Sequence, residues 1–207
     1  WNFYPDVLLT PETYESRDPD SAVPVQIGAY HNFAFGNASA DPHGCGTYTM
    51  TLLLPETPHT YTIELPEVFS AYRFYIGNTL MAEMGDPDAQ DYKEMLRSRA
   101  ITFRASGTVR LLLAVRDQSY FYSGLIYPPA FGETTVVNTR RVMRICLTVS
   151  IVTVILVLAA LALWLQFSAA KRARNAGIFF MLCLCAATTM SYSLVHGVFP
   201  TTIQPWY

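Results

Sequence analysis

The residues best suited to bind a small molecule lie in one short stretch of the chain, "DQSYFYSGLIY" at 117–127. Aromatic rings stack on the apolar faces of sugars while nearby polar side chains fix hydroxyl groups, a usual composition for a small-molecule site. The competing interpretation is that the alternating tyrosines complete a protein core. The predicted ligand-binding residues are Asp117, Gln118, Tyr120, Tyr122 and Tyr127.

Three acidic side chains in "GDPDAQD", namely Asp86, Asp88 and Asp91, are hard oxygen ligands of the kind that Ca²⁺ accepts. The stretch lacks the glycine and the bidentate glutamate of an EF-hand loop, so a polar surface loop is the competing interpretation. The histidines are isolated in sequence and lack the spacing of zinc ligands. We therefore predict no metal site and no cofactor, and Ca²⁺ at the three aspartates stays an open alternative.

No spacing in the sequence singles out a catalytic residue. A glycoside hydrolase needs two carboxylates facing each other across a cleft, and the sixteen acidic residues offer many pairs of equal merit. The sequence also lacks a nucleophile elbow and a phosphate-binding glycine loop. We therefore predict that this chain is not itself an enzyme.

Charge divides the chain into two parts. Only 14% of the residues are charged and 51% are apolar, which excludes a disordered chain and a basic nucleic-acid-binding surface. Residues 1–138 contain all sixteen acidic residues and eight basic ones, a net charge of −8. Residues 139–207 contain six basic residues and no acidic one. The sequence therefore predicts a boundary near residue 138, with a membrane region after it.

Two uncharged apolar runs predict a hairpin of membrane helices in this second part. One covers about 145–167 and the other about 176–199, and a bilayer core needs roughly 20 apolar residues per helix. The short basic loop at 171–174 between them makes the two helices antiparallel neighbours. The acidic part suits the outer side of the membrane, so we predict residues 1–144 outside and the basic loop in the cytoplasm. A core helix of a soluble protein is the competing interpretation.

The second predicted helix contains hydroxyl side chains, among them Thr188, Thr189 and Ser191. In lipid such groups bond across helices, and a two-helix hairpin supplies few partners. We therefore expect further membrane helices of the same chain.

The first part of the chain alternates between apolar and polar residues in short runs, which is typical of half-buried strands. Six to nine such strands, separated by turn signals, predict a mainly β fold, an antiparallel β-sandwich or jelly roll. At most one short helix, at 89–98, fits the pattern. The clearest alternating runs are 47–54, 60–65, 72–76, 101–103 and 109–115.

Two further predictions concern local structure in this part. Gly77-Asn78 suits a primed two-residue turn, which needs a positive φ, and Leu80 and Ala82 would continue on the returning strand. Val25 and Ile27 would open a strand that ends in "YHNFAF".

Several of these segments together resemble the outer jelly-roll domain of bacterial seven-transmembrane receptors with diverse intracellular signalling modules. The segments are "HGCGTYTMTLLLPE", "YTIELPEVFSAYRFYIGNTLMAEMG" and "VRLLLAVRD" with "SGLIYPPAFGE". An arginine-rich linker at 140–144 corresponds to the entry into the family's first membrane helix. The chain departs from the family at Cys45, where a larger residue is commoner, and at Gly77-Asn78, where Asn-Gly is usual.

The resemblance implies a galactose-binding-like sandwich followed by the first two of seven membrane helices, in a bacterial inner membrane. It also implies a homodimer and a cytoplasmic histidine kinase, diguanylate cyclase or phosphatase module elsewhere in the full-length chain. The predicted function is then extracytoplasmic sensing of a small molecule or carbohydrate. The alternatives are a membrane-tethered carbohydrate-binding or adhesion module without signalling, and a fragment of a glycoside hydrolase.

Overall fold

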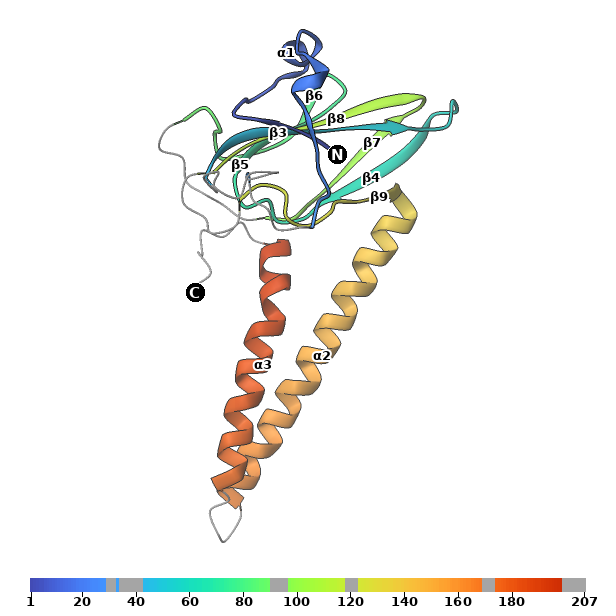
Figure 1. Ribbon diagram of the computed structural model, residues 1–207. Helices are drawn as coiled ribbons and strands as arrows, with labels where there is room; N and C mark the ends of the chain where they lie inside the picture. The colour runs from blue at the N-terminus through green and yellow to red at the C-terminus, as the bar shows by residue number, and fades with distance from the viewer. Residues whose placement is uncertain (29–32, 34–42, 90–96, 118–122, 169–173, 199–207) are drawn as a thin grey trace. The chain divides into compact units, whose positions relative to one another are not determined.

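A computed structural model describes residues 1–28, 33, 43–89, 97–117, 123–168 and 174–198. After Val137 the described chain divides into two compact units. The first is built from two antiparallel β-sheets, and the second contains two long helices (Figure 1).

The first unit is a two-layer sandwich with unequal sheets. The larger sheet has the strand order β2-β1-β3-β8-β5-β6, and the smaller one has the order β7-β4-β9. All neighbouring strands are antiparallel. The strands are β1 (Asn2–Pro5), β2 (Val23–Pro24), β3 (Gly44–Leu53), β4 (His59–Leu65), β5 (Ala71–Ile76), β6 (Thr79–Met84), β7 (Arg99–Ala105), β8 (Thr108–Asp117) and β9 (Ala130–Glu133).

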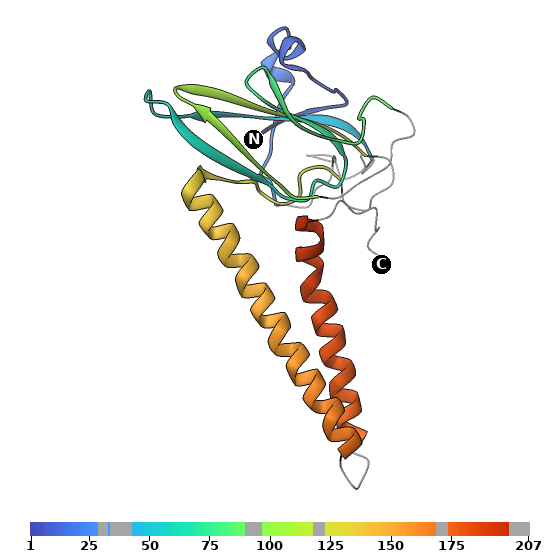
Figure 2. The same cartoon turned by 180° about the vertical axis from the view of Figure 1, so that it is seen from behind.

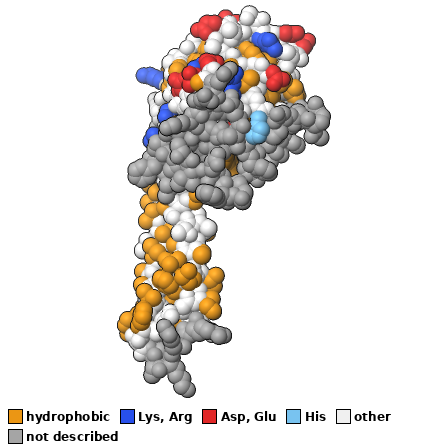
Figure 3. Space-filling model, turned by 90° about the vertical axis from the view of Figure 1, so that its left-hand side faces the viewer, with side chains coloured by type: hydrophobic (Ala, Val, Ile, Leu, Met, Phe, Trp, Pro, Cys, Tyr) orange, Lys and Arg blue, Asp and Glu red, His pale blue; other side chains and the backbone are white. Residues whose placement is uncertain are grey.

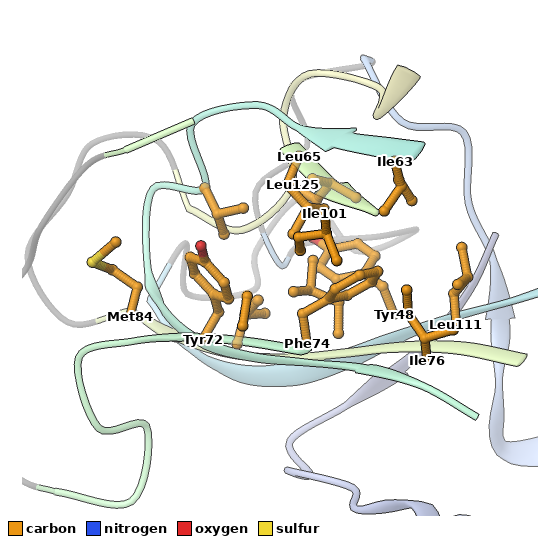
Figure 4. Packing of buried hydrophobic residues seen from close by; sticks show 14 of the residues in the cluster. Tyr48, Ile63, Leu65, Tyr72, Phe74, Ile76, Met84, Ile101, Leu111 and Leu125 are labelled. Atoms are coloured by element: carbon orange, nitrogen blue, oxygen red, sulfur yellow. The ribbon is translucent and has the colours of Figure 1, made fainter. Parts of the chain in front are cut away.

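The alternating runs of the sequence place one apolar face of each sheet in a common core, as predicted. Tyr48, Phe74 and Leu113 from the large sheet are buried against Ile63 and Ile101 from the small one (Figure 4). Because side chains of a strand alternate between its two faces, this core follows directly from the period-two pattern. The prediction of an antiparallel sandwich is confirmed at this level.

One local prediction is confirmed and one is corrected. Gly77 has the positive φ (57°) that the predicted turn needs, and Leu80 and Ala82 both lie on the returning strand β6 as predicted. A register shift next to Phe74 interrupts the β5–β6 pairing. The extra residue of such a bulge breaks the alternation, so Ala82 is buried while Leu80 is 46% exposed. The early strand is Val23–Pro24 instead of a strand from Val25, because only these two residues pair with β1. The continuation to residue 36 and the possible helix at 89–98 lie largely outside the described residues.

An N-terminal segment, whose short helix the sequence did not predict, covers part of the outer face of the large sheet. Helix α1 (Pro11–Glu15) begins after Thr10, whose hydroxyl caps it. Thr47 of β3 holds the segment through two hydrogen bonds, donating to Val7 O (2.7 Å) and accepting from Leu9 N (2.9 Å). The apolar residues beneath it are Tyr4, Leu9, Leu112 and Ala114.

Tyr4 under this segment is expected to make stability sensitive to alkaline pH. Burial, together with a hydrogen bond to Tyr14, raises the pKa of Tyr4 from 10.0 to about 12. A raised pKa favours the neutral phenol in the folded state, so the stabilisation is complete below pH 10 and is lost as the pH rises through about 12. Urea unfolding across this range would show the fall in the free energy of unfolding. Tyr4→Phe should reduce this fall, to which the raised pKa values of Tyr48, Tyr72 and Tyr75 also contribute, and an unchanged slope would contradict the assignment.

The connections between strands fall into two groups at opposite ends of the sandwich. The three tight turns lie together at one end, where Leu54 N donates to Gly107 O (2.8 Å) and Gly77 N donates to Arg110 O (2.8 Å). Two of them, β3–β4 and β7–β8, project side by side in Figures 1 and 2. We call the opposite end the long-loop end. There β3, β5, β7 and β9 begin, and β4, β6 and β8 end.

The second unit consists of α2 (Thr134–Ser168) and α3 (Arg174–Val198). Helix α2 begins eleven residues before the predicted span, directly after β9, and so includes the segment 140–144 expected to be a linker. The chain has no proline or glycine between Gly132 and Ser168 to interrupt it. Small buried residues allow the two helices to approach closely. They are Ala159, Ala162, Cys183 and Ala187.

Both helices are long and apolar enough to cross a membrane. In each helix only 11% of the apolar 18-residue stretch is buried. The core helix of a soluble protein would be mostly buried. Trp164 and Phe167 are 65% and 81% exposed, and the face of the helices in Figure 3 carries hydrophobic and uncharged atoms. The hydroxyls of Thr188, Thr189 and Ser191 donate to carbonyls of α3 itself. The expectation of further membrane helices therefore does not rest on these three groups, and it stays a prediction.

Candidate functional site

A buried polar cluster lies at the long-loop end of the sandwich, centred on the carboxylate of Asp117. Asp117 is the last residue of β8 and is fully buried. Its Oδ2 lies 2.9 Å from His43 Nδ1 and accepts a hydrogen bond of 2.8 Å from Ser123 Oγ. The antiparallel register of β3 and β8 explains why His43 lies beside Asp117, because Asp117 pairs with Gly44, the residue after His43.

The Gly124 backbone joins this cluster to the start of β5. Phe69 N donates to Gly124 O (3.3 Å), and Gly124 N donates to the buried Ser70 Oγ (2.8 Å). Gly124 has a φ of 74°, and a Cβ built on it would lie only 2.5 Å from the Tyr48 hydroxyl. Close packing and positive φ together explain why glycine stands here.

Tyr127 gives the long-loop end an exposed aromatic ring. The ring is 43% exposed and lies 6.3 Å from that of Phe69, which is itself buried. His43 keeps 38% of its side chain exposed while Asp117 holds one of its ring nitrogens. A stacking surface and an oriented imidazole are thus available at the same end of the fold.

The structure treats the five predicted ligand-binding residues differently. Tyr127 is 43% exposed, whereas Asp117 is fully buried with His43 and Ser123 bound to its carboxylate. Gln118, Tyr120 and Tyr122 lie outside the described residues. Sequence reasoning missed His43, because 74 positions separate it from Asp117 and no local motif connects them.

The cluster does not have the geometry of a hydrolytic triad. In such a triad the histidine lies between the serine and the carboxylate. Here Ser123 and His43 both bind the same oxygen of Asp117, and Ser123 is only 1% exposed. Ser123 is therefore not activated by His43 through this set of contacts.

The acidic stretch considered for Ca²⁺ is occupied by a cation from the protein itself. The guanidinium of Arg73 donates to Glu83 (Nε–Oε1, 2.8 Å), to Asp86 (Nη2–Oδ1, 2.7 Å) and to Asp88. These hydrogen bonds, chiefly those to Glu83 and Asp88, raise the pKa of Arg73. Asp91 is not among the described residues, and within those residues no group of three or more potential ligands could hold a metal.

Arg73→Gln is expected to loosen the turn at 85–89. Removing the guanidinium leaves three carboxylates close together, but all three are more than 40% exposed, so solvent screens much of their repulsion. We expect a loss of about 1 kcal/mol in the free energy of unfolding. Faster amide hydrogen exchange at 85–89 in the variant would report the loosened turn. High salt should make this difference in exchange smaller, because it screens the repulsion between the carboxylates. Arg104→Gln, which removes an exposed arginine of β7, is the control and should have little effect.

The last strand of the sandwich passes directly into the first long helix. Thr134, the first residue of α2, donates to Thr60 O (3.1 Å) and accepts from Thr62 Oγ1 (3.0 Å), both on β4. Val137, one turn later, is buried and lies against Gly132 of β9. The first turn of α2 is therefore part of the sandwich.

No protein-family model matches the chain, and no curated protein is similar to it in sequence. In structure it is similar to a GH2 β-galacturonidase from Eisenbergiella tayi bound to galacturonate (11% identity, TM-score 0.41). It is also similar to a β-glucuronidase from an uncultured Clostridium species (15% identity, TM-score 0.40). Each match covers 63% of this chain, but only 22% and 27% of the respective enzymes. Likeness at this level carries nothing about activity.

Proposed function

We propose that this chain is the outer sensory domain and first membrane hairpin of a bacterial signalling receptor. The long-loop end would bind a small molecule or carbohydrate, with Tyr127 stacking on it and His43 supplying a hydrogen bond. The observation that carries the proposal is the direct passage of β9 into α2. A binding module that was merely tethered would need no such connection.

The path from ligand to helix is short. Six residues separate Tyr127 from Thr134, and four of them form β9, which starts at the long-loop end. Hydrogen bonds of Thr134 with Thr60 and Thr62 hold the first turn of α2 to β4. A ligand that holds Tyr127 in one position would favour one position of β9, and therefore one position of the start of α2. Such a ligand signals only if it binds two states of this connection with different affinity.

The proposed topology places the acidic sandwich outside the cell and the loop at 171–174 in the cytoplasm. In a variant without the four native cysteines, Glu56→Cys at the β3–β4 turn and Lys171→Cys would report the two sides. An impermeant maleimide should label Glu56→Cys on intact spheroplasts and Lys171→Cys only after lysis. Labelling of Lys171→Cys on intact spheroplasts would overturn the topology.

The two alternatives give different results with the full-length protein. A signalling receptor should have further membrane helices and a cytoplasmic kinase, cyclase or phosphatase module whose output changes with ligand, whereas an adhesion module should have no such output. A glycoside hydrolase fragment would cleave a glycoside and lose that activity on replacement of one carboxylate. Ligand-dependent output without hydrolysis is the result we expect.

A further inference from the structure

Two buried polar atoms at the long-loop end have no hydrogen-bond partner among the residues that the structure describes. Tyr72, the second residue of β5, is 1% exposed and projects from the large sheet into the space between the layers (Figure 4). Its hydroxyl has no hydrogen-bond partner in the part of the chain that the structure describes. The large majority of buried side-chain polar atoms in proteins have a partner, so this hydroxyl requires an explanation.

Two arginines lie near this hydroxyl. Arg97 has a buried Nε that likewise has no partner in the described structure. Arg99 pairs in register with the buried Leu65, so its side chain is on the face of β7 that is turned toward the core. Neither arginine forms an ion pair with any acidic residue that the structure describes. Burial raises the pKa of Tyr72, and the charges of Arg99 and Arg97 oppose this rise, which reflects their proximity.

These groups share one chemical requirement. A guanidinium offers only donors, a tyrosine hydroxyl can donate, and the missing component is an acceptor. Guanidinium groups match the two oxygens of a carboxylate or phosphate, with short charge-assisted hydrogen bonds. A singly charged carboxylate costs less to bury than a phosphate dianion, particularly in a domain whose net charge is −8.

We propose that Tyr72, Arg97 and Arg99 bind the carboxylate group of a small organic acid or acidic sugar. The inference rests on the proposed function, because it names the chemical class of ligand that the long-loop end would sense. The carboxylate would bind at the long-loop end of the core, beside the Tyr72 hydroxyl and the Arg97 Nε. Tyr127, at the same end of the fold, remains available for the rest of the ligand.

Calorimetry on the full chain in lipid nanodiscs tests this inference. Acetate, succinate and glucuronate would be titrated, with glucose as the uncharged counterpart of glucuronate and inorganic phosphate as the competing anion. We expect binding of at least one carboxylate, and weaker or no binding of glucose and phosphate. Arg97→Gln and Tyr72→Phe should each weaken carboxylate binding about tenfold or more.

Arg104→Gln is the matched control for Arg97→Gln, because it also replaces one arginine by glutamine. Arg104 is exposed and lies near the end of β7 that is farther from Arg97. It should leave binding unchanged. Tyr72→Phe keeps the buried ring and removes only an unpartnered hydroxyl, so a folded protein is expected, and near-ultraviolet circular dichroism would verify it.

Three results would overturn the inference: no binding of any carboxylate, tighter binding of phosphate, or binding that Arg97→Gln leaves intact. The first would indicate that ordered water satisfies these groups. Each is distinguishable from failure of the proposed function, which the cysteine-labelling experiment reports independently of ligand.

Discussion

Asp117→Ala is expected to lower the free energy of unfolding by about 2–4 kcal/mol. The carboxylate is fully buried and binds both Ser123 and His43. Its removal leaves the buried Ser123 hydroxyl without this acceptor and opens a small cavity at the end of β8. Urea unfolding of the detergent-solubilised chain, followed by near-ultraviolet circular dichroism, would measure the loss.

Two milder variants separate the contributions to this effect. Ser123→Ala removes one donor while Asp117 keeps His43, so we expect a loss of about 1 kcal/mol. Asp117→Asn keeps the volume and one acceptor oxygen, and its loss should fall between the two. Equal stability of Asp117→Ala and the unmodified protein would show that the cluster does not hold the long-loop end together.

Gly124→Ala should destabilise the sandwich to a similar extent. The positive φ costs a residue with a Cβ about 1–2 kcal/mol, and the new methyl would lie 2.5 Å from the Tyr48 hydroxyl and 3.0 Å from the Phe33 ring. Tyr48 is buried in the core and has little room to move, so overpacking adds about 1–3 kcal/mol. We therefore expect a total loss of about 2–5 kcal/mol in the same unfolding measurement.

Gly77→Ala is the matched control for this prediction. Gly77 also has a positive φ (57°), but a Cβ there would meet nothing within 4 Å. The loss in the free energy of unfolding of Gly77→Ala should be limited to the backbone cost of the positive φ, about 1–2 kcal/mol. If both variants lose the same stability, the close packing of Gly124 against Tyr48 contributes nothing.

The sequence by itself determined the features that repeat over short distances. Period-two alternation identified the strands that carry Tyr48, Ile63 and Phe74, because each strand must bury one face whatever its neighbours are. Gly77 marked its turn for the same reason, since the need for positive φ is local. The uncharged runs likewise identified two helices long and apolar enough for a membrane.

Only the tertiary structure decided which residues meet. Strand register brings His43 to Asp117 over 74 positions, and the guanidinium of Arg73 gathers carboxylates that the sequence presented as possible Ca²⁺ ligands. The continuity of β9 with α2 depends on hydrogen bonds from Thr134 to β4, a strand distant in sequence. Alternation specifies which face of a strand is buried, whereas the pairing of distant strands is set by the packing of the whole domain.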